Sequence, residues 1–506
     1  MISIISTSRA LAQLASEIPV AFIDTRPRQD YVRSHAVFSV NAPLDSLESQ
    51  ILQLFGTEAA IAIIIGQTDQ EAIWAGRKIL ALTHLNPQVI EGGFSSWVNQ
   101  NLPTWGGEYT PSKAFGEWVD QTGMVNGIEP KTAMQKVPDY QYDVRPALEF
   151  QKFSLSESQH CPTGRLGTLT MRSGSIYVHC AGRTRGIIAA QTLYDLNYPG
   201  TVRFINGGTQ GWELQGGTRT LGNRVSQSER ISNDQELERA ERLAVNFAIP
   251  VLSITALNEW KQKHHHHRIL SVSEDGLSPS DISPTTLIQS TDQYLGTHHI
   301  PILITGTASL DVAVTALWLR RMGWDAYALF EAICQEKQIN DHPVITANKW
   351  PSELKHHQIL DTRPSEAFEK ARVIGSAWCP RTQLTLHETN KPTLLIGDNA
   401  VTLNATARYA KILGFRLVQM RLWNEAPDYV VDRDPFQFGD MPSDRALFFP
   451  KRHDGDMNDS ANYLTWEHSL LKTLETYGHI PWATVNDQRI HPKSHLSEFY
   501  QGITKS

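Results

Sequence analysis

The chain has 506 residues and a net charge of −7, and these two values already limit its class. A single hydrophobic core rarely extends over so many residues, so about three to five domains are expected. The negative charge gives no reason to expect nucleic acid or an anionic membrane as a partner.

The apolar segments and the cysteines predict the compartment. The first residues lack the basic start and long apolar run of a secretory signal, and no stretch approaches the roughly 18 apolar residues of a membrane span. The cysteines are too few and too scattered for a disulfide framework, and no CxxC pair predicts a zinc site. The four cysteines are Cys161, Cys180, Cys334 and Cys379. We therefore expect a cytoplasmic protein without a membrane partner, a metal or another cofactor.

A short phrase, Asp-x-Arg-Pro, recurs along the chain and predicts an internal repeat. It stands at residues 24–27, 143–146 and 361–364, each time after a short apolar run and before a helix-like segment. A further copy has lost the phrase and reads Ser271-Val272-Ser273. Each copy is followed by a strand of the buried type, expected at 60–65, 175–179, 301–305 and 393–396. Strands that alternate with helices predict α/β domains with parallel sheets.

The repeat predicts four domains and a tail. The domains are expected at residues 1–110, 115–225, 235–345 and 346–440, and a C-terminal helical tail at 441–506. In the tail a charged run from Lys451 to Asp456 precedes Asp459-Ser460, which predicts a helix cap. The following helix has an apolar face, which we expect to pack on a repeat or on the second subunit of a homodimer.

The copies differ in the loop after the buried strand. In the first copy this loop, residues 66–71, is acidic and lacks a cysteine. The third and fourth copies also lack one, at residues 305–309 and 397–402. Only the second copy carries a thiol there, Cys180, so we expect the chemistry in this copy alone.

Cys180 ends the buried strand of the second copy and begins a basic loop. A helix is expected after the loop, opening with Ile187. Free backbone N–H groups at a helix N-terminus favour negative charge, and two arginines add to this effect. Both predict a thiol with thiolate character, able to act as a nucleophile. The loop residues are Ala181, Gly182, Arg183, Thr184, Arg185 and Gly186.

The spacing within this loop distinguishes two families of cysteine enzymes. Cysteine phosphatases usually need five residues between the cysteine and the arginine, but only four separate Cys180 from Arg185. The smaller bowl suits a single sulfur atom better than a tetrahedral phosphate. At this point the sequence resembles the rhodanese family of sulfurtransferases. The flanking segments resemble the same family: Asp143-Val144-Arg145 with Glu149, and Asn206-Gly207-Gly208 with Trp212.

The resemblance implies both a fold and a reaction. The fold is α/β, with tandem rhodanese-like domains that each have a central, mostly parallel sheet flanked by helices. Cys180 would attack the outer sulfur of thiosulfate, release sulfite, and pass the sulfur from a persulfide to a thiol or cyanide. Arg183, Arg185 and the loop N–H groups would hold the donor, while Asp143 and Arg145 would support the loop.

Several alternatives stay open. The donor could be 3-mercaptopyruvate, or the chain could be a non-enzymatic persulfide carrier or sensor that binds a protein partner. A cysteine phosphatase is disfavoured by the short loop. Cys161 could resolve a persulfide on Cys180 as a disulfide, although a small buried thiol is expected there. The tract His264–His267 is expected to be a solvated strand entry rather than a metal site.

Overall fold

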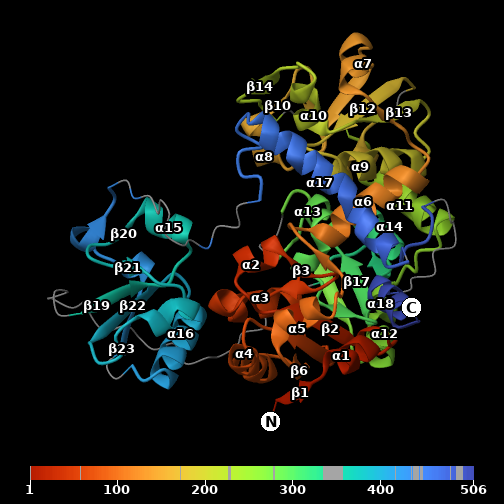
Figure 1. The fold of residues 1–506 in the computed structure, drawn as a ribbon. Helices are drawn as coiled ribbons and strands as arrows, with labels where there is room; N and C mark the ends of the chain where they lie inside the picture. Colours follow the sequence, from red (N-terminus) through yellow and green to blue (C-terminus); the bar gives the residue numbers. More distant parts are fainter. Residues whose placement is uncertain are drawn as a thin grey trace.

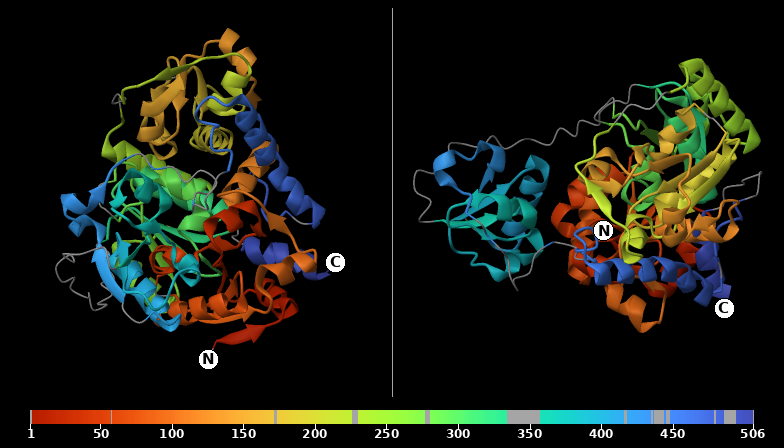
Figure 2. Two further views of the ribbon diagram at one scale, coloured as in Figure 1. Left: turned by 60° about the vertical axis from the view of Figure 1, so that its left-hand side comes forward. Right: turned by 90° about the horizontal axis from the view of Figure 1, so that it is seen from above.

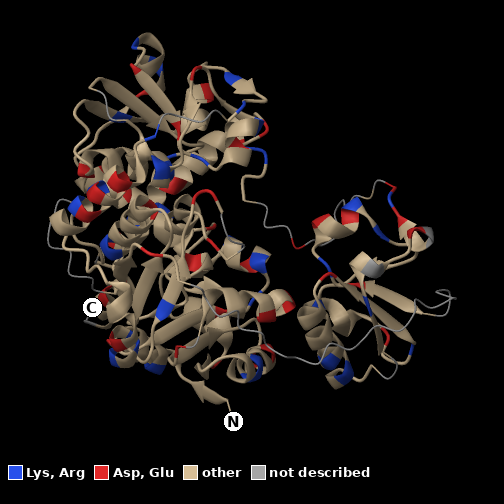
Figure 3. Ribbon diagram, turned by 180° about the vertical axis from the view of Figure 1, so that it is seen from behind, with Lys and Arg blue, Asp and Glu red and all other residues tan. Residues whose placement is uncertain are grey.

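The protein is represented by a computed structural model. The structure describes residues 2–56, 58–170, 173–225, 230–276, 280–333, 357–415, 418–434, 436, 444, 448–478, 480–485 and 494–505. Four sheets follow one another along this part of the chain, each with helices on its faces (Figure 1). We call the part of the chain that forms each sheet and its helices a unit, and number the units in chain order. Acidic and basic residues are mixed on the same elements (Figure 3).

The first sheet has the strand order β1-β6-β5-β2-β16, with β4 also beside β2. Its strands pair in parallel except β16, which comes from the third unit of the chain and pairs antiparallel with β2. All five residues of β2 are buried, as expected for a parallel strand covered on both faces. The strands are β1 (Ser3–Ile5), β2 (Val20–Asp24), β4 (Val40–Asn41), β5 (Ile61–Ile65), β6 (Asn86–Ile90) and β16 (Thr297–His298). The helices are α1 (Thr7–Leu14), α2 (Arg28–Arg33), α3 (Leu47–Leu54), α4 (Asp69–Leu82) and α5 (Gly93–Asn99).

The second sheet has the order β11-β9-β12-β13-β8, and all of its pairs are parallel. A separate antiparallel pair, β10 with β14, lies beside it. The strands are β8 (Gly127–Ile128), β9 (Tyr140–Asp143), β10 (Phe153–Leu155), β11 (Gln159–His160), β12 (Ser175–His179), β13 (Thr201–Ile205) and β14 (Arg219–Leu221). The helices are α6 (Thr110–Thr122), α7 (Pro130–Gln135), α8 (Ala147–Lys152), α9 (Thr184–Asp195) and α10 (Gly208–Leu214).

The third sheet is β15-β17-β18 and the fourth is β21-β19-β22-β23, both parallel. An antiparallel pair, β20 with β24, accompanies the fourth sheet. The strands are β15 (Arg268–Ser271), β17 (Pro301–Thr305), β18 (Asp325–Leu329), β19 (Gln358–Asp361), β20 (Arg372–Val373), β21 (Ala377–Trp378), β22 (Thr393–Gly397), β23 (Val418–Leu422) and β24 (Val431–Asp432). The helices are α11 (Asn233–Asn246), α12 (Leu257–Lys263), α13 (Pro284–Gln289), α14 (Ser309–Arg321), α15 (Ser365–Lys370) and α16 (Ala400–Ile412).

The predicted α/β fold class is confirmed, and the buried strands lie where the sequence places them. The strands expected at 175–179 and 301–305 are β12 and β17, while β5 and β22 differ from their expected spans by one residue at one end. Such differences are usual at element ends. The domain boundaries stay a prediction.

Two hydrophobic clusters hold the sheets together. One contains side chains of the first three sheets, among them Phe22, Val178 and Ile304, and the other joins the first sheet to the fourth. Trp318 of α14 donates to Thr192 of α9 at 2.9 Å, which links the second and third units. The fourth sheet lies to one side of the other three (Figures 1 and 2).

The C-terminal segment returns to the first and second units. Helix α17 (Met457–Thr476) packs on α6 and α10, and α18 (His495–Lys505) packs on α1 (Figure 1). The cap predicted at Asp459-Ser460 is wrong, because Asp456 accepts the N–H groups of Asn458 and Asp459 and starts the helix earlier. No helix in the described part of the chain has the length and apolar composition needed to cross a membrane.

Candidate active site around Cys180

A buried ion pair fixes the strand that enters the site. The Arg145 guanidinium donates to both carboxylate oxygens of Asp143 and to the carbonyl of Phe153, and Ser154 donates to Asp143 at 2.7 Å. Burial acts to raise the pKa of Asp143, but His179, Arg145 and Ser154 together lower it to about 2. The Arg145 backbone N–H also donates to Asp143, so this carboxylate shapes the turn after β9.

The same ion pair occurs at the two other copies of the phrase. Arg26 donates to Asp24 and Arg363 donates to Asp361 in the same pattern. Because the copies without a cysteine keep this ion pair, it serves the backbone rather than the chemistry.

Cys180 lies directly after β12, on the wall of a pocket of about 250 Å³. Its side chain is buried, with 2% of the residue exposed. Helix α9 begins at Thr184 rather than at Ile187, so part of the loop already belongs to the helix. All of the predicted loop residues from Ala181 to Arg185 line the pocket, whereas Gly186 packs behind the backbone of His179 and Cys180.

Helix α10 holds the loop from the other side. Thr209 and Gln210 donate their backbone N–H groups to the carbonyls of Cys180 and Ala181 at 2.9 and 3.0 Å. Gly208 has φ +54°, and a Cβ there would stand 2.3 Å from the Cys180 carbonyl oxygen. Only glycine permits this approach, which explains the Gly-Gly pair that resembles the rhodanese motif.

Burial of Cys180 opposes the thiolate character expected from the loop. Burial raises the pKa of the Cys180 thiol, and Glu467 adds to the rise. Arg185 and the N–H groups of Gly186 and Gly182 act in the expected direction but do not overcome burial. The electrostatic features inferred from the loop are present, and burial of the thiol, with a contribution from Glu467 of α17, outweighs them.

Both loop arginines are paired with carboxylates. Arg183 donates to Glu117 at 2.7 and 3.0 Å and also to Asp120, both on α6. Arg185 donates to Glu149 at 2.6 and 2.9 Å. Arg183 is therefore tied to a neighbouring helix, and Arg185 is the loop arginine whose charge acts on Cys180.

Helix α17 forms the roof of the pocket. Glu467 accepts hydrogen bonds from Thr184 at 2.9 Å and from Lys113 at 3.2 Å, and Lys113 also contacts the Tyr463 hydroxyl. A Cβ at Gly182 would stand 2.9 Å from Glu467 Oε2 and 3.0 Å from the Tyr463 ring. The C-terminal helix therefore lies directly against the cysteine loop.

Three pocket residues were missed by sequence reasoning. They are Gln210, Arg452 and His453. The side-chain amide nitrogen and oxygen of Gln210, the Nε atom of Arg452 and the Nδ1 atom of His453 are all buried without a hydrogen-bond partner among the described residues. The Arg452 guanidinium also donates to the carbonyl of Phe449 and stacks on Tyr463. Within the described structure no carboxylate pairs with it. The charged run from 451 to 456 was the available signal, but nothing local in it indicated Cys180.

The remaining candidate residues lie in structural positions. The His179 ring contacts Ser158 at 2.7 Å, in agreement with the predicted structural role. Cys161 and Cys379 are buried free thiols, and burial raises the pKa of each to about 12. Cys334 lies outside the described residues. Among the described residues, the His264–His267 tract included, no group of three or more His, Cys, Asp or Glu side chains could hold a metal ion.

Known proteins share this architecture. Residues 7–100 match the sequence model of the rhodanese-like domain. A thiosulfate sulfurtransferase from Pseudomonas aeruginosa has a similar structure, with a TM-score of 0.79 and 21% sequence identity over 94% of this chain and 98% of that chain. The chain has the rhodanese fold. The matched domain model falls on the first unit, whereas Cys180 lies in the second.

Other structural likenesses are weaker. A rhodanese-like domain of the Alr3790 protein from Anabaena sp. has a TM-score of 0.19 and 17% identity, over 21% of this chain and 80% of that one. An EanB variant in complex with ergothioneine has a TM-score of 0.23 and 11% identity, over 65% and 95%. Scores this low carry no functional argument. No curated protein matches this chain in sequence.

Proposed function

We propose that this protein is a sulfurtransferase that takes sulfane sulfur from thiosulfate onto Cys180 and passes it to a small thiol or to cyanide. The observation that carries the proposal is the position of Cys180. It lies just before α9 in a small pocket, where the N–H groups of Gly182 and Gly186 donate to its sulfur and the positive charge of Arg185 acts on it.

The first half-reaction forms the persulfide. The Cys180 thiolate attacks the outer sulfur of thiosulfate, the S–S bond of the donor breaks, and sulfite leaves with the bonding electron pair. Arg452, which has no carboxylate partner among the described residues, supplies charge for the anionic donor. The N–H groups of Gly182 and Gly186 stabilise the negative charge on the bound sulfur.

The second half-reaction returns the enzyme to its starting state. An acceptor thiolate or cyanide attacks the outer sulfur of the persulfide, and the Cys180 thiolate leaves. The products are a new persulfide or thiocyanate.

Burial of the thiol favours small acceptors over a protein partner. Only 2% of Cys180 is exposed, and Tyr463 and Glu467 cover the adjacent loop. A thiol on a folded protein needs an open approach to the sulfur, whereas cyanide or a small thiol fits a pocket of about 250 Å³. This geometry argues against the carrier or sensor alternative.

A second donor, 3-mercaptopyruvate, is supported by a different observation. Both loop arginines are already neutralised by carboxylates, and the Glu467 carboxylate beside the loop is paired with Lys113. A monoanion therefore fits the charge of the pocket as well as a dianion does. The unpartnered amide of Gln210 could bind its carboxylate or keto oxygen.

The pH dependence of sulfite release tests the proposal. Because burial raises the pKa of Cys180, the thiolate is a minor species near neutral pH and its fraction grows with pH. We expect the rate of the first half-reaction, measured as sulfite released from thiosulfate in a single turnover at subsaturating donor, to rise about tenfold per pH unit between about pH 6 and pH 8.

Two results would contradict this account. A flat profile over that range would mean that the thiolate is preformed. No sulfite at any pH, together with pyruvate formation from 3-mercaptopyruvate, would exclude thiosulfate and select the second donor.

A further inference from the structure

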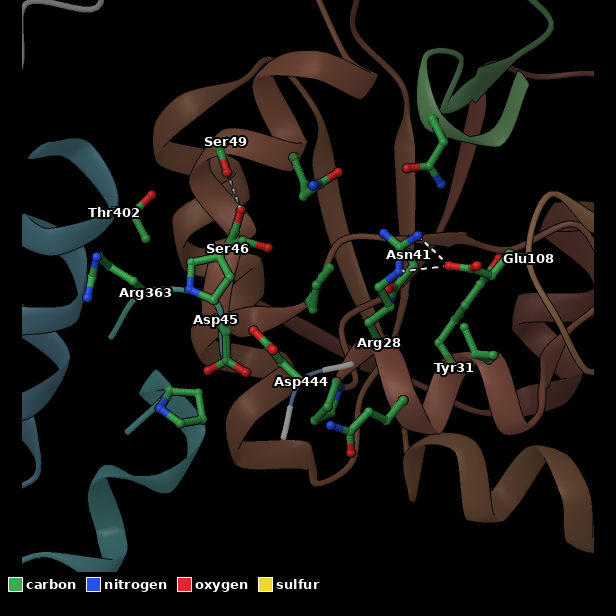
Figure 4. Close-up of a pocket in the computed structure, with 18 of the residues that line it drawn as sticks. Arg28, Tyr31, Asn41, Asp45, Ser46, Ser49, Glu108, Arg363, Thr402 and Asp444 are labelled. Carbon is green, nitrogen blue, oxygen red and sulfur yellow. Dashed lines mark hydrogen bonds and ion pairs between the residues drawn. The ribbon is translucent and has the colours of Figure 1, made fainter. Parts of the chain in front are cut away.

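A larger pocket, of about 550 Å³, lies between the first and fourth units. Asp45, Ser46 and Ser49 line it from the first unit, and Arg363 and Thr402 face them from the fourth (Figure 4). Pockets of this size hold small organic molecules. Glu108 and Tyr109 line this pocket and also the Cys180 pocket, so the two are neighbours.

The lining has an excess of carboxylates over cations. Its two arginines are already paired, Arg28 with Glu108 (Figure 4) and Arg363 with Asp361. The other acidic side chains of the lining form no ion pair with any described lysine, arginine or histidine. These are Asp45, Asp292, Asp398 and Asp444.

Of these four carboxylates, Asp292 alone has a buried oxygen without a hydrogen-bond partner among the described residues. Only 4% of the residue is exposed, and its Oδ1 atom has no hydrogen-bond partner in the described structure. Burial and the nearby Glu108 raise the pKa of Asp292 to about 7, although the positive charge of Arg28 acts in the opposite direction. An unsatisfied buried carboxylate oxygen costs free energy, and a bound cation would offset that cost.

The spread of the carboxylates indicates the kind of cation. Asp45 belongs to the first unit, Asp292 to the third and Asp398 to the loop after β22 in the fourth. Among the described residues no group of three potential ligands could hold a metal ion. An extended molecule can reach carboxylates that stand apart, whereas a single metal ion cannot.

We propose that this pocket binds a small organic polycation, with its ammonium groups placed against the carboxylates of Asp292 and Asp398. Although the two pockets share Glu108 and Tyr109, binding of a cation here does not depend on the proposed sulfur transfer.

Calorimetric titration of the full chain with spermidine tests this site. We expect saturable binding of one equivalent by the wild type. Asp292→Asn should weaken the affinity at least about tenfold, because a buried charge pair is lost. Asp398 is exposed, so Asp398→Asn keeps the fold and should weaken binding about two- to threefold. Asp234→Asn makes the same charge change on α11, away from the lining, and should leave the affinity unchanged.

Three results would overturn the proposal. One is no saturable binding to the wild type. Another is an equal affinity for Asp398→Asn, Asp292→Asn and Asp234→Asn, which would mean general attraction to an acidic protein. The third is displacement of spermidine by an equal concentration of Mg²⁺, which would mean a metal site. Thermal unfolding of each variant checks that its fold is retained.

Discussion

Cys180→Ser is expected to abolish sulfite release from thiosulfate, with a loss of at least about a thousandfold in kcat/KM. A serine hydroxyl is not deprotonated near neutral pH and cannot form a persulfide. The substitution keeps the size and burial of the side chain at a residue that is 2% exposed, so the fold should persist. Turnover is measured as sulfite and thiocyanate formed from thiosulfate and cyanide.

Cys161→Ala is the matched control for this loss. Cys161 is also a buried free thiol in the second unit, at 3% exposure. We expect this variant to retain turnover. If Cys161→Ala were folded and also inactive, Cys161 would be needed to resolve the Cys180 persulfide as a disulfide. That result would contradict the single-cysteine mechanism.

Arg452→Gln is expected to raise the KM for thiosulfate roughly ten- to hundredfold, the value of one charge-assisted hydrogen bond. Arg452 lines the Cys180 pocket with its Nε atom unpartnered, and no described carboxylate neutralises it. Since the residue does not take part in bond formation, kcat should change less than KM. Steady-state kinetics with thiosulfate as the varied substrate measure both.

Arg433→Gln provides the control for charge alone. Arg433 is exposed in the fourth unit and pairs with Asp428 at 2.9 Å. We expect its KM to equal that of the wild type. If both variants raised the KM equally, the effect would come from the net charge of the protein, and Arg452 would not be a donor-binding residue.

The strand and loop around Cys180 could be predicted because their determinants are local. The apolar run of β12 and the turn fixed by Asp143 are each set by neighbours within a few residues. Repetition of the same phrase along the chain then extended the prediction from one unit to the whole α/β fold.

The chemistry of the pocket could not be predicted in the same way, because its roof comes from a distant segment. Thr184 and Glu467 are separated by 283 residues, and Arg183 and Glu117 by 66. Nothing in the sequence of the loop indicates that α17 lies against it or that α6 neutralises Arg183. Glu467, which adds to the rise in the Cys180 pKa, and Arg452, which lines the pocket, both come from this distant segment.

Mass spectrometry of the protein after incubation with thiosulfate, without an acceptor, tests the central claim most directly. We expect the peptide that contains Cys180 to gain the mass of one sulfur atom, with one equivalent of sulfite released. Cyanide should then remove the added mass as thiocyanate. An unmodified Cys180 peptide, or a sulfur atom on Cys161 or Cys379 instead, would contradict the account.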